Sequence, residues 1–207
     1  LRNKGTILAD AGRYSEAEII LKEALNTAKE NFAPEDPQLS AYIRALAALY
    51  AKTGNYELAI QLEKESRRLL KNRFGDTYPD YITGLINEAA LHRACSRLTT
   101  ADTLLHEALQ LLEREKRTQT ASYTAALMQL GKVCQASKKY GQARALLEKS
   151  ARLGGAVLGA EHPAYHELYG EALVQQDLLE NRPDSALRRL NAMHDPILIA
   201  YGDRHQR

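Results

Sequence analysis

The chain has 207 residues, and its 28 basic and 26 acidic side chains leave a net charge of +2. A charge so nearly balanced excludes the strongly basic field that gathers nucleic acid or an anionic membrane surface. Ala and Leu make up close to a third of the chain, whereas Trp is absent and Phe occurs twice, a composition that favours helices over a β-sandwich.

Cysteine usage and hydropathy narrow the setting of the protein. Two cysteines are too few for a disulfide framework, so we expect a reducing, cytoplasmic location. No apolar run approaches the ~20 residues that span a bilayer, and we expect no membrane association. Because the chain begins with Leu1 and shows no signal peptide, we expect it to be part of a longer protein.

A small residue recurs every 42 positions along the chain. The recurring residues are Ala17, Ala59, Ala101 and Ala143. Other positions keep the same period, namely Gly12, Gly54, Ser96 and Lys138 five residues earlier and Tyr14, Tyr56, Leu98 and Tyr140 three residues earlier. A fifth copy follows one residue out of register, with Ala186 in the alanine position. Such a period is typical of repeat proteins built from stacked supersecondary units.

The segments between these marks have helical periodicity. Residues 39–52 carry apolar side chains at helical spacing, which predicts an amphipathic helix. Gly54 is suited to end that helix in the left-handed conformation, and residues 56–71 predict a second helix. The alanine that follows each turn predicts a close helix hairpin, because antiparallel helices at ~8–10 Å admit only a small side chain where they approach most closely.

Each copy is therefore predicted to contain helix A, a tight turn, helix B and a loop. We expect an all-α fold in which residues 1–207 form a single array of about five antiparallel hairpins. The approximate repeats are 1–36, 37–78, 79–120, 121–162 and 163–207. Gly154 and Gly155 are expected to fray the fourth helix B, because glycine in a helix interior costs ~1 kcal/mol.

The turn carries a family resemblance. Gly12-x-Tyr14-x-x-Ala17 and Gly54-x-Tyr56-x-x-Ala59 resemble the turn of the tetratricopeptide repeat (TPR). The 42-residue length and loops such as residues 74–81 are similar to the kinesin light chain type, which also occurs beside bacterial CHAT-family protease domains. The resemblance implies a right-handed superhelical solenoid that binds protein partners, with the A helices lining a concave groove.

Candidate catalytic and metal-binding groups are few. His92 and Cys95 are three residues apart on a predicted helix, but His92 falls at the repeat position of Leu8 and Tyr50, which indicates packing. His162 and His166 have the i, i+4 spacing of a shared metal site, without a third ligand in the pattern. We therefore predict no enzyme activity, no metal and no cofactor.

The A-helix residues that the resemblance places in the groove form a cationic and amide-rich set. These candidate ligand-binding residues are Arg2, Asn3, Thr6, Arg44, Asn87, Arg93, Gln129, Lys132 and Gln135. Arginine grips carboxylates and amides pair with a peptide backbone, while Ala48 and Ala90 leave room for side chains. The set predicts a peptide or protein ligand of acidic character, although ordinary solvated residues are an equally good interpretation.

Two other functions fit the same sequence. The repeats are consistent with a regulatory segment that acts in cis on a catalytic domain outside this chain, such as a CHAT-type protease. They are also consistent with a self-associating scaffold, a homo-oligomer formed through exposed solenoid ends.

Overall fold

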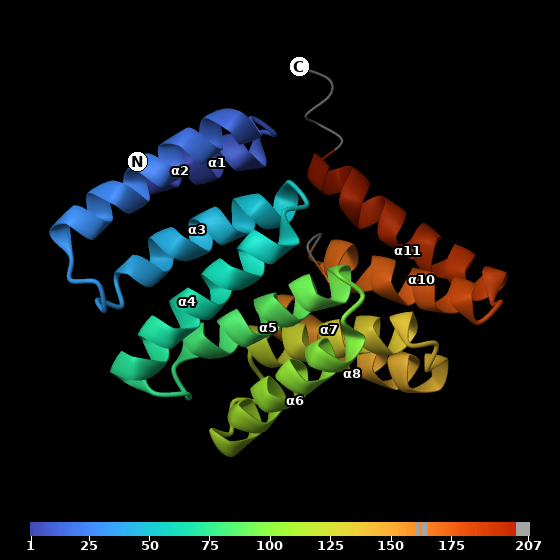
Figure 1. The fold of residues 1–207 in the computed structure, drawn as a ribbon. Helices are drawn as coiled ribbons and strands as arrows, with labels where there is room; N and C mark the ends of the chain where they lie inside the picture. Colours follow the sequence, from blue (N-terminus) through green and yellow to red (C-terminus); the bar gives the residue numbers. More distant parts are fainter. Residues whose placement is uncertain (160–161, 163–164, 202–207) are drawn as a thin grey trace. The chain divides into compact units, whose positions relative to one another are not determined.

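The computed structural model describes residues 1–159, 162 and 165–201, and within these ranges all regular structure is helical (Figure 1). The all-α prediction is confirmed. The helices divide between two compact units, residues 1–111 and the residues from Leu112 onward. The division falls inside helix α6 (Leu98–Arg114). The single array and its repeat boundaries stay a prediction.

The first unit is built from antiparallel helix pairs. Helix α1 (Arg2–Asp10) packs on α2 (Tyr14–Asn31), and α3 (Leu39–Lys52) packs on α4 (Tyr56–Phe74). Contacts of α3 with both α1 and α2 join the two pairs, and α5 (Pro79–Ala94) packs on α4 (Figure 1). The helix predicted over residues 39–52 matches α3, and the one predicted over 56–71 continues three residues further in α4.

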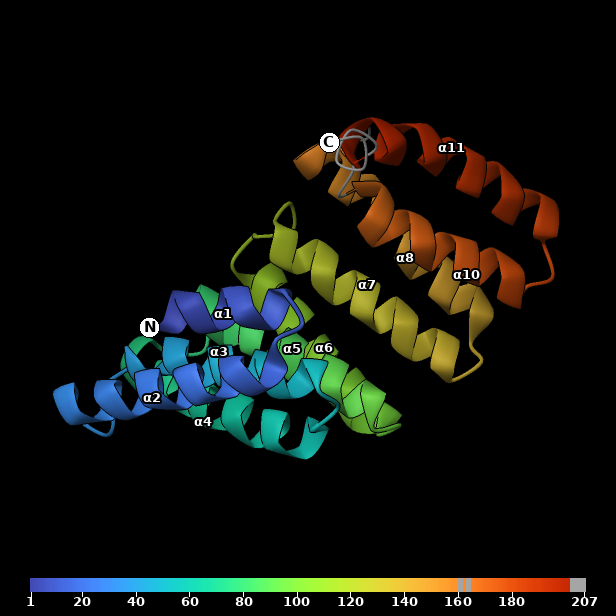
Figure 2. The same cartoon turned by 90° about the horizontal axis from the view of Figure 1, so that it is seen from above.

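The second unit repeats the hairpin. Helix α7 (Ala121–Ala136) packs on α8 (Tyr140–Leu158). A short π-helix, η1 (His166–Gly170), leads directly into α10 (Glu171–Leu179), which packs on both α8 and α11 (Pro183–Tyr201) (Figure 2).

The hairpin turns share one backbone conformation. Gly12 and Gly54 have φ of 77° and 81°, in the left-handed region. Ser96 and Lys138, at the same repeat position, both keep φ at 59° although they carry a Cβ. Asn181, with φ of 56°, is displaced by the one residue that the sequence predicts for the fifth copy. The period therefore specifies the turn even where glycine is replaced.

The recurring alanines are buried, in agreement with the predicted close packing of each hairpin. Ala17, Ala59, Ala101 and Ala143 are all completely buried, and Ala186 is buried in the fifth copy. The packing interpretation of His92 is also confirmed, because the position shared by Leu8, Tyr50, His92 and Cys134 is buried in each copy.

The prediction that Gly154 and Gly155 fray their helix is wrong. Helix α8 continues through both glycines to Leu158, and Gly159 ends it with φ of 90°. Gly154 is buried because Tyr169 packs directly on its Cα: an added Cβ would lie 2.6 Å from the tyrosine hydroxyl. Tertiary packing thus outweighs the low helix propensity of glycine.

Candidate functional site

An open pocket lies along the A helices of the first unit, and we call it the α1–α3–α5 pocket. It has a volume of about 580 Å³. Its lining residues come from α1 (Arg2, Asn3, Thr6, Ile7), α3 (Ala41, Arg44, Ala45, Ala48), α4 (Glu63) and α5 (Asp80, Asn87). Equivalent positions of successive A helices are 42 residues apart, so their side chains point to the same side and line one pocket. Three alanines of α3 leave the room that larger side chains would fill.

Five of the sequence-predicted residues line this pocket together: Arg2, Asn3, Thr6, Arg44 and Asn87. The guanidinium carbon of Arg2 lies 5.6 Å from the ring centroid of Tyr42. An Arg44 nitrogen (Nη1) lies 3.7 Å from Asp80 Oδ1, and the Arg44 side chain is 26% exposed. The two arginines are thus oriented by neighbours while remaining in reach of a ligand.

The other four predicted residues lie elsewhere. Arg93 is half-buried on α5, and its Nε is buried without a hydrogen-bond partner within the described residues; burial lowers its pKa. Gln129 and Lys132 are half-buried on α7 of the second unit. Gln135 is buried there, and its amide donates to Gln176 Oε1 at 3.0 Å.

Sequence reasoning missed two acidic residues of the pocket, Glu63 and Asp80. Glu63 belongs to a B helix and is buried, and its Oε1 accepts a hydrogen bond from Asn87 Nδ2 at 3.3 Å. Burial raises the pKa of Glu63 to about 7, against the opposing effects of Arg44 and the Asn87 hydrogen bond. The 42-residue register holds the signal that could have found it, because Glu63 stands where Leu21 stands one repeat earlier.

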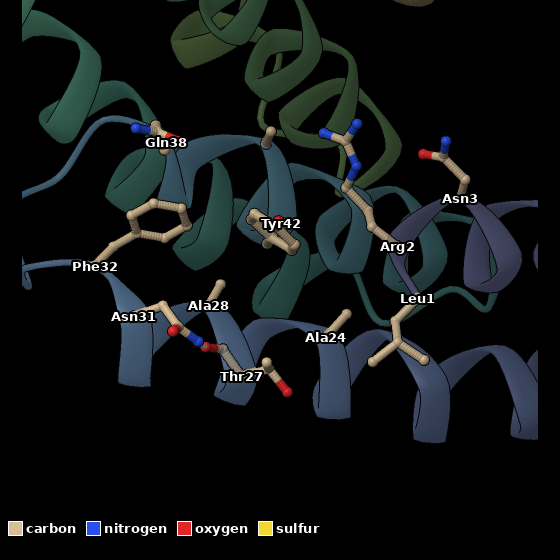
Figure 3. A pocket seen from close by; sticks show the side chains of 11 residues that line it. Leu1, Arg2, Asn3, Ala24, Thr27, Ala28, Asn31, Phe32, Gln38 and Tyr42 are labelled. Carbon is tan, nitrogen blue, oxygen red and sulfur yellow. Dashed lines mark hydrogen bonds between the residues drawn. The ribbon is translucent and has the colours of Figure 1, made fainter.

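A second pocket, of about 700 Å³, lies between α2 and the start of α3. Figure 3 shows Phe32 and Tyr42 facing Ala24 and Ala28 across it, with Arg2 at one side. Of the predicted residues, this pocket gathers only Arg2 and Asn3. The α1–α3–α5 pocket is therefore the candidate site.

No group of three potential metal ligands occurs within residues 1–159, 162 and 165–201. His92 lies 3.4 Å from Glu88 Oε1 inside the helix packing, and Cys95 is half-buried. The described helices include none that combines the length and apolar character needed to cross a bilayer.

Solved structures with the same fold include kinesin light chain-like proteins. A putative kinesin light chain of Podosopora anserina with nearly identical TPR-like repeats has a TM-score of 0.71 and 18% identity, covering 96% of this chain and 94% of its own. BtubC (BKLC) from P. vanneervenii has a TM-score of 0.74 and 19% identity, covering 97% and 81%. These likenesses confirm the kinesin light chain-type fold, whereas the link to CHAT-family proteases stays a prediction.

Two curated relatives match the chain over most of its length. The secreted RxLR effector protein RXLR-C07 of Plasmopara halstedii is 21% identical over 203 residues, which are 98% of this chain and 62% of the relative. The RxLR effector protein SFI4 of Phytophthora infestans is 21% identical over 207 residues, which are 99% of this chain and 60% of the relative. The chain thus spans about three-fifths of the length of these relatives.

Family profiles agree with the hairpin architecture. Two tetratricopeptide repeat profiles match residues 1–72 and residues 124–164, together more than half of the chain. The matched segments contain the buried alanines Ala17, Ala59 and Ala143 and the left-handed turns before them. The chain therefore belongs to the tetratricopeptide repeat family.

Proposed function

We propose that this protein is an interaction module that binds an extended, acidic peptide segment in the α1–α3–α5 pocket. Tetratricopeptide repeats serve as protein-interaction modules, which supports the general class. The observation that carries the finer proposal is the convergence of Arg2 and Arg44, from two successive A helices, on one pocket.

The two arginines supply the acidic preference. A guanidinium group binds a carboxylate through two parallel hydrogen bonds, which gives geometric specificity as well as attraction. Arg44 is weakly engaged, because its 3.7 Å approach to Asp80 is longer than a good ionic hydrogen bond. Since Asp80 is half-exposed, a ligand carboxylate can replace it at Arg44 while Asp80 remains solvated.

Amide and small side chains supply the extended conformation. Asn3 and Asn87 lie on α1 and α5 and offer donors and acceptors that match a peptide backbone. Ala41, Ala45 and Ala48 lie between them on α3 and leave space for alternate ligand side chains. A peptide that crosses the A helices therefore meets polar groups at both sides and an arginine near each.

The acids of the pocket do not cancel this preference. Asp80 is the exposed partner of Arg44, and Glu63 has a pKa of about 7, so Glu63 carries only part of its charge at neutral pH. Arg2 and Arg44 remain fully charged at that pH. The pocket is thus net cationic below pH 7.

Fluorescence anisotropy with two labelled octapeptides tests the proposal on the full chain. One peptide alternates Glu and Ala, and the other alternates Lys and Ala. We expect the Glu peptide to bind more tightly, and the double variant Arg2→Glu/Arg44→Glu to lose at least about tenfold in affinity, because each guanidinium–carboxylate pair contributes roughly 1–3 kcal/mol.

The matched control reverses two charges outside the pocket, in Arg13→Glu/Arg68→Glu. Arg13 and Arg68 are exposed and pair with Glu16 and Glu35. This control is expected to bind the Glu peptide within about twofold of the wild type, since exposed pairs outside the site contribute little. Equal affinity for both peptides, or an unchanged affinity in a folded Arg2/Arg44 variant, would contradict the proposal.

A further inference from the structure

Glu63 occupies a position that three other repeats use for the hydrophobic core. The residues 42 apart from it are Leu21, Leu105 and Leu147, which are 1%, 0% and 2% exposed. Glu63 is itself only 4% exposed. A carboxyl group therefore stands where the fold otherwise places a fully buried leucine, and burying it costs free energy that leucine does not.

Two neighbouring charged residues, the buried Glu88 and the partly buried Arg67, also stand at positions that hold leucine in other repeats, but they compensate each other. Arg67 replaces the leucines found at 25 and 109, and Glu88 replaces those at 46 and 130. Arg67 donates to Glu88 Oε2 from Nε at 3.0 Å and from Nη2 at 2.6 Å. The hydrogen bonds between Arg67 and Glu88 offset the cost of burying these two charges, whereas Glu63 takes no part in this ion pair.

Glu63 is incompletely satisfied. Its Oε1 accepts the Asn87 hydrogen bond, but its Oε2 is buried and has no hydrogen-bond partner among the described residues. Buried polar atoms are nearly always paired, so an unpaired one on a residue that lines a pocket is a candidate for a ligand contact. Glu63 is one of the residues that line the pocket, together with Arg2 and Arg44.

We propose that Glu63 is a ligand-binding residue of the α1–α3–α5 pocket, and that its neutral carboxyl group donates a hydrogen bond from Oε2 to a carboxylate oxygen of the bound peptide. The inference rests on the proposed function and identifies a residue that recognises the carboxylate of the bound peptide. With Oε1 already accepting from Asn87, the proton belongs on Oε2, which then needs an acceptor. Arg44, from the adjacent helix, binds the same ligand carboxylate.

Burial, and not the surrounding charges taken together, favours the neutral form of Glu63. Burial is the largest effect and raises its pKa to about 7. Arg44 from α3 and Arg67 on α4 lower the pKa, as does the hydrogen bond from Asn87 of α5, whereas Glu88 of α5 raises it. Asp80 of α5 and Arg2 of α1 complete the charges that line the pocket.

The bound state therefore requires a proton that leaves as the pH rises. Affinity is constant below the pKa and falls above it, because only the protonated fraction of Glu63 can donate. Between pH 6 and pH 8 that fraction drops about tenfold for a pKa of about 7. The ligand carboxylates stay ionised over this range, so their charge does not change.

Anisotropy titrations of the alternating Glu–Ala octapeptide at pH 6 and pH 8 test the inference with two variants of the full chain. Glu63→Gln keeps an acceptor and a permanent donor, and it is expected to bind equally at both pH values, as tightly as the wild type at pH 6. Glu63→Leu restores the residue of the other repeats, and it is expected to lose at least about tenfold in affinity at pH 6 while raising the urea midpoint of unfolding. Glu65→Gln, two residues further along α4, is the matched control and should follow the wild type.

The outcomes separate this inference from the function on which it rests. If the wild type binds the Glu peptide with the same affinity at pH 6 and pH 8, or if Glu63→Gln retains the full pH dependence, the role of Glu63 is overturned and peptide binding stands. A lower urea midpoint for Glu63→Leu would identify Glu63 as a structural residue and would also overturn it. If the wild type binds at neither pH, the proposed function itself fails.

Discussion

Gly154 of α8 and Tyr169 of η1 lie against each other so closely that no Cβ fits between them. An added Cβ at Gly154 would lie 2.6 Å from the tyrosine hydroxyl oxygen and nearer still to two ring carbons. The hydroxyl donates to Thr124 Oγ1 at 3.1 Å, which anchors the ring to α7. The glycine is therefore a packing residue that joins three helices of the second unit.

Gly154→Ala is expected to destabilise the fold by about 1–3 kcal/mol, because the ring must move and weaken its hydrogen bond to Thr124. Helix propensity alone would predict a gain of about 1 kcal/mol for the same substitution. Gly141→Ala is the matched control, because an added Cβ there meets no atom within 4 Å. Urea denaturation of both variants decides between the two effects, and a Gly154→Ala variant more stable than the wild type would contradict the packing role.

The hairpin alanines make a second prediction. Ala59 is completely buried where α4 approaches its partner α3, so Ala59→Leu should lower the free energy of unfolding by ~1–3 kcal/mol through overpacking. Leu58, the preceding residue, is 46% exposed, and Leu58→Ala should change stability by less than about 1 kcal/mol. Urea midpoints of the two variants should differ accordingly; equal midpoints would show that the hairpin tolerates a larger side chain.

The fold could be predicted because the same local signals recur at one spacing. Buried alanines and left-handed turns follow from short-range chemistry, and the period adds evidence that one copy alone lacks. The exception is Gly154, where the contact with Tyr169 leaves no space for a side chain. The repeat spacing does not predict that long-range contact. Propensity describes a helix in isolation, whereas packing depends on the neighbour.

The site could be predicted in part for a related reason. Arg2, Arg44 and Asn87 share the pocket-facing side of successive A helices, so helical register was enough to group them. Glu63 reaches the same pocket from a B helix. The repeat register predicts that the inner face of a B helix lies in the core, so it did not point to Glu63. Gln135 keeps the register too, but α10 packs over it, and its amide bonds to Gln176 there. Contacts with the next helix decide which polar residues a ligand can reach.

The turn at Ser96 provides a third prediction. Ser96 has φ of 59° at the repeat position where Gly12 and Gly54 stand, and a side chain in this region costs about 1–2 kcal/mol. Ser96→Gly should therefore stabilise the fold by up to about 1 kcal/mol, after the added freedom of the unfolded chain is subtracted. The reciprocal variant Gly54→Ser should lower the melting temperature. The expectation fails if Ser96→Gly melts below the wild type.

The last prediction concerns a buried acid in the second unit. Asp177 is fully buried and accepts hydrogen bonds from Arg144 at 2.7 Å, Arg189 at 2.8 Å and Ser185 at 3.0 Å. Burial alone would raise its pKa, but these three donors outweigh burial and hold the pKa below its usual range. Arg144 also hydrogen-bonds Glu180, whose pKa it lowers.

A carboxyl group whose pKa is lower in the folded state stabilises the fold when ionised and loses that contribution as the pH falls through the folded-state pKa. Asp177→Asn should therefore cost about 3 kcal/mol at pH 7, because it removes the fully buried anion that the partly buried Arg144 and Arg189 share, and the gap should narrow below about pH 4. Asp184→Asn, at an exposed aspartate early in α11, is the control and should stay within about 0.5 kcal/mol of the wild type. Urea unfolding of the three proteins between pH 3 and pH 7 measures both the cost and its pH dependence. A gap between wild type and Asp177→Asn that stays constant over this range would mean that the Asp177 charge does not stabilise the fold.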